Sequence, residues 1–186
     1  MNAVKIVGAA GKRHENDFYP TPPECTVALC EWMKEQGFLS RNVWEPACGD
    51  GSMVKVLEKY FDRVVATDIQ YGTDFLTAEM PDGIEWIITN PPFSLAEQFI
   101  RKAAECNISF AMLLKSQYWH SARRKKLFDE IRPSHILPLT WRPDFTGKGS
   151  SLLDMQWVVW ARTDSYTTYF HPLGRPKRKT ISREEP

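Results

Sequence analysis

The segment Asn90-Pro91-Pro92-Phe93 carries the most specific chemical signal in the chain. It follows an apolar run, residues 84–89, and its two prolines predict a rigid extended turn whose carbonyls stay outside helical hydrogen bonds. The Asn90 side-chain oxygen and the Pro91 carbonyl offer two acceptors for the hydrogens of a planar amino group, and Phe93 offers a ring for stacking. When such an amine attacks an electrophilic methyl group, positive charge develops that the two acceptors stabilise. The segment therefore predicts a site that polarises an aromatic amine.

A second signal is a loop of small residues, Glu45-Pro46-Ala47-Cys48-Gly49-Asp50-Gly51, between an apolar run and a helical pattern. Small side chains permit close approach of the backbone to a ligand, and the helix that follows presents free amides. The loop lacks the Gly-x-Gly-x-x-Gly dinucleotide fingerprint, so by itself it indicates either a cofactor site or an ordinary turn.

Acidic residues in the next segment favour the cofactor interpretation. Asp68 comes about 20 residues after the loop, at the end of the next apolar run, where a carboxylate accepts hydrogen bonds from both hydroxyls of a ribose. A strand-ending Asp that only caps a turn is the alternative. Asp74 and Phe75 follow closely, and there a carboxylate accepts from an adenine amino group while the ring packs on the base.

Hydrophobic periodicity predicts the elements that position these residues. The apolar runs fit parallel strands buried on both faces, so alternation with helices implies an α/β sandwich. The last two strands are joined by a loop too short for a crossover helix, which predicts an antiparallel hairpin and a mixed sheet. The predicted strands are residues 42–44, 64–67, 84–89, 108–114, 134–140 and 155–161, and the predicted helices are residues 25–33, 53–61, 95–103 and 119–131.

Length and composition describe an ordinary globular protein. The chain has 186 residues, 24 lysines and arginines against 23 acids, and a net charge of +1, so no strong overall field favours nucleic acid. Four cysteines without a Cys-x-x-Cys pair and four scattered histidines predict reduced thiols and no metal site. No apolar run reaches the ~18 residues of a membrane span, so a cytoplasmic protein is expected, in the host cytoplasm if phage-encoded. We expect one domain over residues 16–170, a flexible arm over 1–15 and a flexible basic tail over 171–186.

Together these segments resemble the S-adenosylmethionine-dependent amino-group methyltransferases, especially the small phage-type DNA adenine-N6 enzymes with an Asn-Pro-Pro-Phe motif. The resemblance covers roughly residues 17–161. It implies a Rossmann-like methyltransferase fold, S-adenosyl-L-methionine as the cofactor, and a catalytic set made of Asn90, Pro91, Pro92 and Phe93. It also implies that the segment before the first helix contacts the methionine end of the cofactor. The implied cofactor-binding residues are Tyr19, Pro20, Thr21, Glu45, Ala47, Cys48, Gly49, Gly51, Asp68, Ile69, Asp74, Phe75 and Asn90.

Spacing refines the expected fold. The span between Gly51 and Asn90 is too short for a target-recognition domain, and the residues after Phe93 are mostly used by the remaining strands and helices. We therefore expect no separate recognition domain. Asp68 and Asp74 are so close that the usual helix after the second strand is missing and the third strand is short or absent. The sheet is accordingly predicted to be trimmed at that edge.

Cys48 is not predicted to be a nucleophile. Cytosine-C5 methyltransferases use a Cys next to Pro after the fourth strand, where this chain has Asn90 and Pro91 instead. Cys48 is predicted to pack beside the cofactor as a small apolar residue.

The substrate is less well determined than the reaction. Adenine in DNA, adenine in RNA and a glutamine amide in a protein all present a flat amine, and DNA is favoured because the segments around residues 90–100 and 157–160 look like the phage-type DNA enzymes. Phe93 favours adenine N6 mildly over cytosine N4. A non-catalytic binding protein with a vestigial cofactor pocket is the alternative from a different class, and the oligomeric state stays open.

Contacts to nucleic acid are predicted at local basic sites. Lys115 follows the predicted strand over residues 108–114, and the predicted helix over residues 119–131 carries a basic cluster. The loop over residues 141–153 is a better candidate than this helix, because its glycines let it bend into a groove of DNA. A reader this small makes few base contacts, which predicts a short or relaxed recognition site. The predicted contacts are Lys115, Arg123, Arg124, Arg142 and Lys148.

Overall fold

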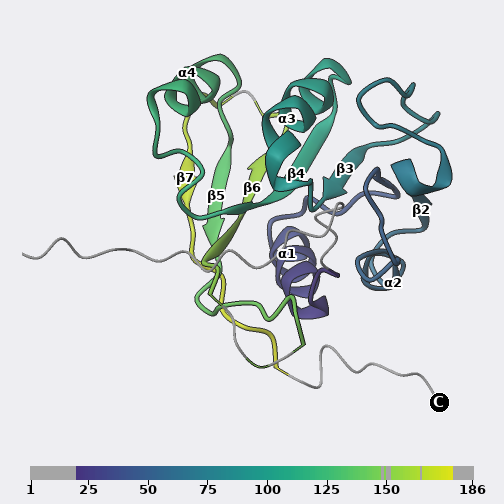
Figure 1. Cartoon of the computed structure of the whole chain (residues 1–186), viewed down its shortest axis with the longest axis horizontal. Helices are drawn as coiled ribbons and strands as arrows, with labels where there is room; N and C mark the ends of the chain where they lie inside the picture. The colour runs from purple at the N-terminus through teal and green to yellow at the C-terminus, as the bar shows by residue number, and fades with distance from the viewer. Residues whose placement is uncertain (1–19, 148, 150–151, 164, 178–186) are drawn as a thin grey trace, which may run out of the picture.

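The computed structural model describes residues 20–147, 149, 152–163 and 165–177. These residues form a seven-stranded sheet with helices on both of its faces (Figure 1). The strands are β1 (Asn42–Glu45), β2 (Arg63–Ala66), β3 (Trp86–Thr89), β4 (Ser109–Lys115), β5 (His135–Pro138), β6 (Met155–Trp160) and β7 (Tyr169–Phe170). The helices are α1 (Pro23–Glu35), α2 (Val54–Leu57), α3 (Ala96–Glu105) and α4 (Ala122–Glu130), with short 3₁₀ helices η1 (Ile69–Tyr71) and η2 (Phe93–Leu95).

The strand order is β2-β1-β3-β4-β6-β5-β7. The first four strands in this order are parallel to one another, whereas β6 runs antiparallel to both β4 and β5. The predicted fold class is therefore confirmed: an α/β sandwich with a mixed, mostly parallel sheet and an antiparallel β5–β6 hairpin.

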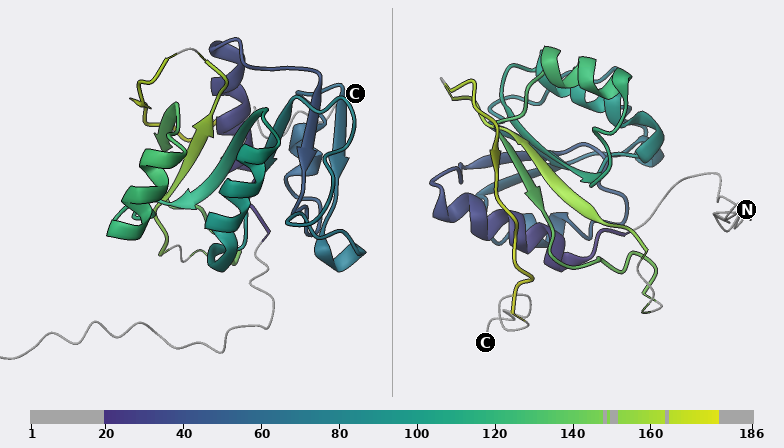
Figure 2. Two further views of the ribbon diagram at one scale, coloured as in Figure 1. Left: turned by 90° about the horizontal axis from the view of Figure 1, so that it is seen from above. Right: turned by 90° about the vertical axis from the view of Figure 1, so that its left-hand side faces the viewer.

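Helices cover the two faces of the sheet, with α1 and α2 on one side and α3 and α4 on the other (Figures 1 and 2). Successive strand residues point to opposite faces, so Val43 packs with the core under α1 while Trp44 packs with the core under α3. Ile88 and Ile87 divide in the same way. These four side chains are fully buried, so both faces of β1 and of β3 are covered.

Helix α1 begins and ends where its sequence indicates. Pro23 occupies the first turn, where its missing N–H costs no hydrogen bond. After the last turn the Phe38 N–H donates to the Met33 carbonyl at 2.8 Å and the Gly37 N–H donates to the Lys34 carbonyl at 3.2 Å, the Schellman pattern of helix ends.

Strand β2 differs from the prediction of a buried strand. It is the outermost strand at its edge, and its residues are half-buried at Val64 and Val65 and exposed at Arg63 and Ala66. The reason is the trimmed edge itself, because no described strand covers the outer side of β2.

Two helices are shorter than predicted. Helix α2 has four residues, and the chain continues as turns to the buried Phe61. Helix α4 starts after Ser121, whose side-chain oxygen accepts from the Arg124 N–H at 3.3 Å. Trp119 therefore lies before the helix, and its ring packs edge-on against Phe128 at a centroid distance of 5.2 Å. The apolar Trp119, which suggested an earlier helix start, thus packs on α4 from the preceding turn.

The sequence analysis misses β7 and sets the end of the core too early. Strand β7 pairs with β5 in parallel, and beyond it the N–H groups of His171 and Leu173 donate to the carbonyls of Ile136 and Pro138. Leu173 is 5% exposed. Residues 171–173 of the predicted flexible tail are thus paired with the sheet. The predicted arm, residues 1–15, and residues 178–186 lie outside the described residues.

Candidate active site

The carboxyl ends of four strands meet at one edge of the sheet, because β2, β1, β3 and β4 are parallel neighbours. Glu45 ends β1, Asp68 follows β2, Asn90 follows β3 and Lys115 ends β4. The fold therefore brings the loop of small residues, the strand-end acid and the Asn-Pro-Pro-Phe segment to the same edge.

The loop between β1 and α2 is held against the end of β2. The Cys48 N–H donates to the Thr67 carbonyl at 3.0 Å, and the Gly51 N–H donates back to the Cys48 carbonyl at 2.8 Å. Gly49 and Gly51 have φ values of 52° and 79°, in the left-handed region that favours glycine. A Cβ at Gly51 would meet no atom within 4 Å, so the space beside this loop is open.

Asp68 fastens the loop to the turn that follows β2. One carboxylate oxygen accepts from the Gly49 N–H and the other from the Gln70 N–H, both at 2.9 Å. Gln70 Nε2 and the Tyr71 hydroxyl donate to the Gly49 carbonyl at 2.9 and 3.1 Å. A carboxylate has about four acceptor positions, so Asp68 keeps capacity for two further donors such as ribose hydroxyls.

Apolar surface adjoins Asp68. Ile69 and Tyr71 in η1 are 71% and 69% exposed, although both are large hydrophobic residues. Ile69 therefore offers an open apolar contact next to the acid, in the place where the sequence predicts a cofactor contact.

Asp74 and Phe75 occupy different environments. One Asp74 side-chain oxygen accepts from the Leu76 N–H at 3.0 Å and so caps a turn. The Phe75 ring is 2% exposed and packs between Trp44 and Phe99, at centroid distances of 5.1 and 4.8 Å. The structure thus places Phe75 in the core beneath the site, where almost none of its ring surface is left for a ligand.

Glu45 is a fully buried acid that links two strand ends. Its Oε1 accepts from the Thr89 hydroxyl at 2.6 Å and from the Ala47 N–H at 3.1 Å, while Oε2 is buried with no hydrogen-bond partner among the described residues. Burial raises the pKa of Glu45 to about 8, against the opposing effect of these hydrogen bonds. The Glu45 side chain thus joins the loop of small residues to Thr89, the residue before Asn90.

Cys48 has the chemistry of an unreactive thiol. Burial, followed by the charges of Glu45 and Asp68, raises the pKa of Cys48 to about 11. Since the thiolate is the nucleophile, this agrees with the prediction that Cys48 packs rather than attacks.

Asn90 is held by one end of its amide. Its Nδ2 donates to the Thr21 hydroxyl at 3.0 Å, and its Oδ1 is buried without a partner among the described residues. Thr21 is 6% exposed and lies two residues before the start of α1, next to the exposed Pro20. Tyr19 lies outside the described residues. The amide therefore presents an unused acceptor, which is the group needed to bind an amino hydrogen.

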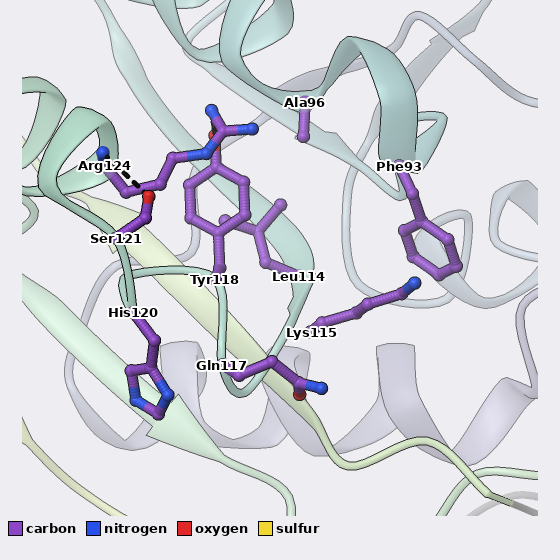
Figure 3. A pocket seen from close by; sticks show the side chains of 9 residues that line it. All are labelled: Phe93, Ala96, Leu114, Lys115, Gln117, Tyr118, His120, Ser121 and Arg124. Atoms are coloured by element: carbon purple, nitrogen blue, oxygen red, sulfur yellow. Dashed lines mark hydrogen bonds between the residues drawn. The ribbon is translucent and has the colours of Figure 1, made fainter. Parts of the chain in front are cut away.

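Phe93 follows Asn90 through two prolines and forms one wall of a pocket. Pro92 precedes η2, and its carbonyl accepts from the Leu95 N–H at 2.9 Å. The Lys115 ammonium lies 4.2 Å from the centre of the Phe93 ring. Figure 3 shows the pocket, about 250 Å³ in volume, whose lining includes Phe93, Ala96, Leu114, Lys115, Tyr118 and Arg124.

The predicted contacts to nucleic acid have different surroundings. Arg123 and Arg124 both pair with Glu97, which the sequence analysis did not connect with them. Arg142 is 59% exposed and pairs with Asp154 at 2.8 Å. Lys148 lies outside the described residues.

Sequence reasoning also misses Thr89, Gln70 and Glu97. Thr89 precedes Asn90 and Gln70 follows Ile69, so both could have been predicted from their positions near strand ends. The signal for Glu97 is weaker. It lies four residues after Phe93, and residues four apart in a helical segment lie on the same face.

The described part of the chain has neither a cluster of metal ligands nor a membrane-spanning helix. No group of three or more His, Cys, Asp or Glu side chains there is arranged to hold a metal ion. In the same residues, no helix has both the length and the apolar character needed to cross a membrane.

No protein-family model and no curated protein matches the sequence. Solved structures do share the fold. A candidate RNA methyltransferase from Pyrococcus horikoshii is 14% identical with a TM-score of 0.60, over 83% of this chain and 91% of that one. A candidate class I S-adenosylmethionine-dependent methyltransferase from Listeria monocytogenes is 13% identical with a TM-score of 0.54, over 82% and 65%.

A third similar structure comes from a restriction system. The modification subunit of a candidate type I restriction enzyme from Vibrio vulnificus is 14% identical with a TM-score of 0.58, over 91% of this chain. This chain spans about half of that subunit, 49% of its length. The protein thus has the Rossmann-like fold found in S-adenosylmethionine-dependent methyltransferases.

Proposed function

We propose that the protein transfers a methyl group from S-adenosylmethionine to the exocyclic N6 amine of adenine in DNA, within a short or relaxed sequence context. The proposal rests on the state of the Asn90 amide. Its nitrogen donates a hydrogen bond to the Thr21 hydroxyl, and its buried oxygen has no hydrogen-bond partner among the described residues. An unsatisfied buried acceptor costs free energy unless a ligand donates to it. An amino group beside Phe93 supplies that donor.

The residues at the sheet edge fit the proposed cofactor. Asp68 retains acceptor capacity for ribose hydroxyls, Ile69 offers an exposed apolar contact, and the space beside Gly51 is open. Thr21 and Glu45 lie nearer Asn90, where the methionine end would lie. When bound, S-adenosylmethionine supplies an electrophilic methyl group on a positively charged sulfur.

The protein's own residues act on the amine. Asn90 Oδ1 and the Pro91 carbonyl accept its two hydrogens, and Phe93 stacks on the ring that carries it. As the nitrogen forms its bond to the methyl carbon and the carbon–sulfur bond breaks, positive charge grows on the nitrogen and strengthens both hydrogen bonds. One amine proton then leaves to solvent. No covalent nucleophile takes part, in keeping with the raised pKa of Cys48.

Adenine in DNA is favoured over the other flat amines by the resemblance of the motif segments to phage-type DNA enzymes. We infer that Arg142, which is 59% exposed on the loop before β6, contacts phosphate. We also propose that the protein is cytoplasmic, like its DNA substrate. A base in a duplex must be flipped out of the stack to reach Asn90.

Incubation with labelled S-adenosylmethionine tests the proposal. Duplex DNA, single-stranded DNA, RNA and protein extract are offered separately, and the products are analysed as nucleosides and peptides. Label in N6-methyladenine from DNA supports the proposal, whereas label only in RNA or in a glutamine amide overturns the substrate. If the protein bound S-adenosylmethionine but transferred label to none of these four substrates, it would be a non-catalytic binding protein and the proposed activity would be wrong.

A further inference from the structure

The pocket beside Phe93 has a second aromatic wall. Tyr118, in the turn after β4, stands across the pocket from Phe93, with Ala96 and Leu114 between them (Figure 3). At about 250 Å³ the pocket is below the ~300–1,000 Å³ of sites for drug-sized ligands, so it suits a single flat ring system.

Arg124 fixes the position of the Tyr118 ring. The guanidinium carbon lies 4.2 Å from the ring centre, and Nη1 donates to the Tyr118 hydroxyl at 2.6 Å. The same Nη1 donates to Glu97 Oε2 at 3.0 Å. Burial raises the pKa of Tyr118 to about 12, so the phenol stays neutral and keeps its hydrogen. A planar guanidinium that is bonded to both Tyr118 and Glu97 therefore restrains the ring.

Glu97 connects this arrangement to the other wall. It lies in the first turn of α3, four residues after Phe93, and is 7% exposed. It also pairs with Arg101 at 3.2 Å and with Arg123 at 2.8 Å. The 3₁₀ helix η2, which begins with Phe93, leads directly into α3, which carries the acid that holds Arg124. The two rings are thus linked through adjoining elements.

Arg123 and Arg124 differ in a way that separates two roles. Both side chains pair with Glu97, but the Arg123 side chain is 75% exposed and touches solvent, whereas the Arg124 side chain is 21% exposed and lines the pocket. A phosphate contact would use the exposed side chain. Arg124 has its polar groups turned to Tyr118 and Glu97 instead.

We propose that Tyr118 is the second stacking partner of the ring that carries the target amine, and that Arg124 is the positioning residue that holds Tyr118 in place. This inference rests on the proposed function for the identity of the ring. It replaces the sequence-based expectation that Arg124 contacts nucleic acid directly.

The matched variants Arg124→Met and Arg123→Met test the inference, because each removes one positive charge and one ion pair to Glu97. The probe is 2-aminopurine riboside, whose fluorescence is quenched when it stacks on aromatic side chains. Wild type and Arg123→Met are expected to quench it saturably with dissociation constants within about twofold of each other, and Arg124→Met to bind about tenfold more weakly. With whichever substrate the protein methylates, Arg124→Met is expected to raise KM more than it lowers kcat.

A second pair keeps the test decisive if Arg124→Met does not fold. Tyr118→Phe keeps the ring and is expected to retain most of the quenching, whereas Tyr118→Ala is expected to lose it. Three results would overturn the inference: no quenching by wild type, equal weakening in Arg123→Met and Arg124→Met, or full quenching by Tyr118→Ala. Quenching is read without methyl transfer, so quenching by a wild type that methylates nothing would overturn the proposed function and leave the ring pocket standing.

Discussion

Asn90 Nδ2 donates to the hydroxyl of Thr21 at 3.0 Å, which joins the residue after β3 to the segment before α1. This bond uses the Asn90 nitrogen and leaves the buried Asn90 oxygen without a partner among the described residues. Thr21→Val keeps the shape of the side chain and removes the acceptor, so we expect methyl transfer to slow by about tenfold while the variant stays folded. Single-turnover rates with saturating cofactor measure this. A rate equal to that of wild type would show that the bond does not orient the amide.

Asp68 is expected to contribute to cofactor affinity. Asp68→Ala removes a charged acceptor for ribose hydroxyls and is expected to weaken S-adenosylmethionine binding by roughly 1 to 3 kcal/mol. The variant also loses the cap of η1 and the bond to the Gly49 N–H, so Asp68→Asn, which keeps the shape, serves as the matched control. Titration calorimetry measures both. Unchanged affinity in folded Asp68→Ala would remove the ribose assignment.

Glu45 predicts a pH dependence of stability. Its folded-state pKa of about 8 is above the ordinary value of 4.5, so the folded state binds more protons between these values. The stabilising contribution is complete below pH 4.5 and is lost as the pH rises toward 8, by on the order of a few kcal/mol. Glu45→Gln is expected to remove this dependence. Urea unfolding between pH 5 and 8 measures it, and parallel curves for the two proteins would contradict the assignment.

Arg142 is expected to contact phosphate. Arg142→Ala is expected to weaken DNA binding about equally for all sequences and to reduce the slope of log affinity against log salt by about one. Arg175 serves as a control, because it is similarly exposed and pairs with Glu24 rather than with Asp154. If Arg142→Ala and Arg175→Ala had the same slope, the loop would not be the DNA contact.

A small recognition surface predicts loose specificity. Each good base contact contributes ~1 to 3 kcal/mol, and the loop over residues 141–153 is long enough for only a few such contacts. We therefore expect methylation of adenine in a context of about two to four bases. Sequencing of methylated DNA measures the consensus. Strict dependence on a site of about six or more base pairs would contradict the prediction.

The sequence predicted the fold where local patterns determine it. The apolar run around Ile87 indicated a parallel strand buried on both faces, and the closeness of Asp68 and Asp74 indicated the trimmed edge. The same trimming leaves β2 exposed, a consequence that the apolar run at Val64 and Val65 does not reveal. Strand β7 was missed because two residues give no periodicity, and its pairing depends on the distant β5.

The candidate site was predictable in its strand-end residues but not in its cross-chain contacts. Parallel strands bring Asn90 and Asp68 to one edge, so order and spacing were enough. The pairing of Glu97 with Arg123 and Arg124 depends on how α3 and α4 pack, and charge alone suggested a free basic surface. The sequence predicted that the Phe75 ring packs on the adenine of the cofactor, whereas the structure buries it in the core. No local sequence pattern distinguishes an aromatic core residue from one that contacts a ligand.

The most direct test of the account compares wild type with Asn90→Ala on duplex DNA and S-adenosylmethionine, with the digested nucleosides measured by mass spectrometry. The account predicts N6-methyladenine with wild type and a rate lower by at least ~10²-fold with Asn90→Ala, while cofactor affinity stays within a few fold. No methylated adenine from wild type, or undiminished methylation by a folded Asn90→Ala, would contradict it.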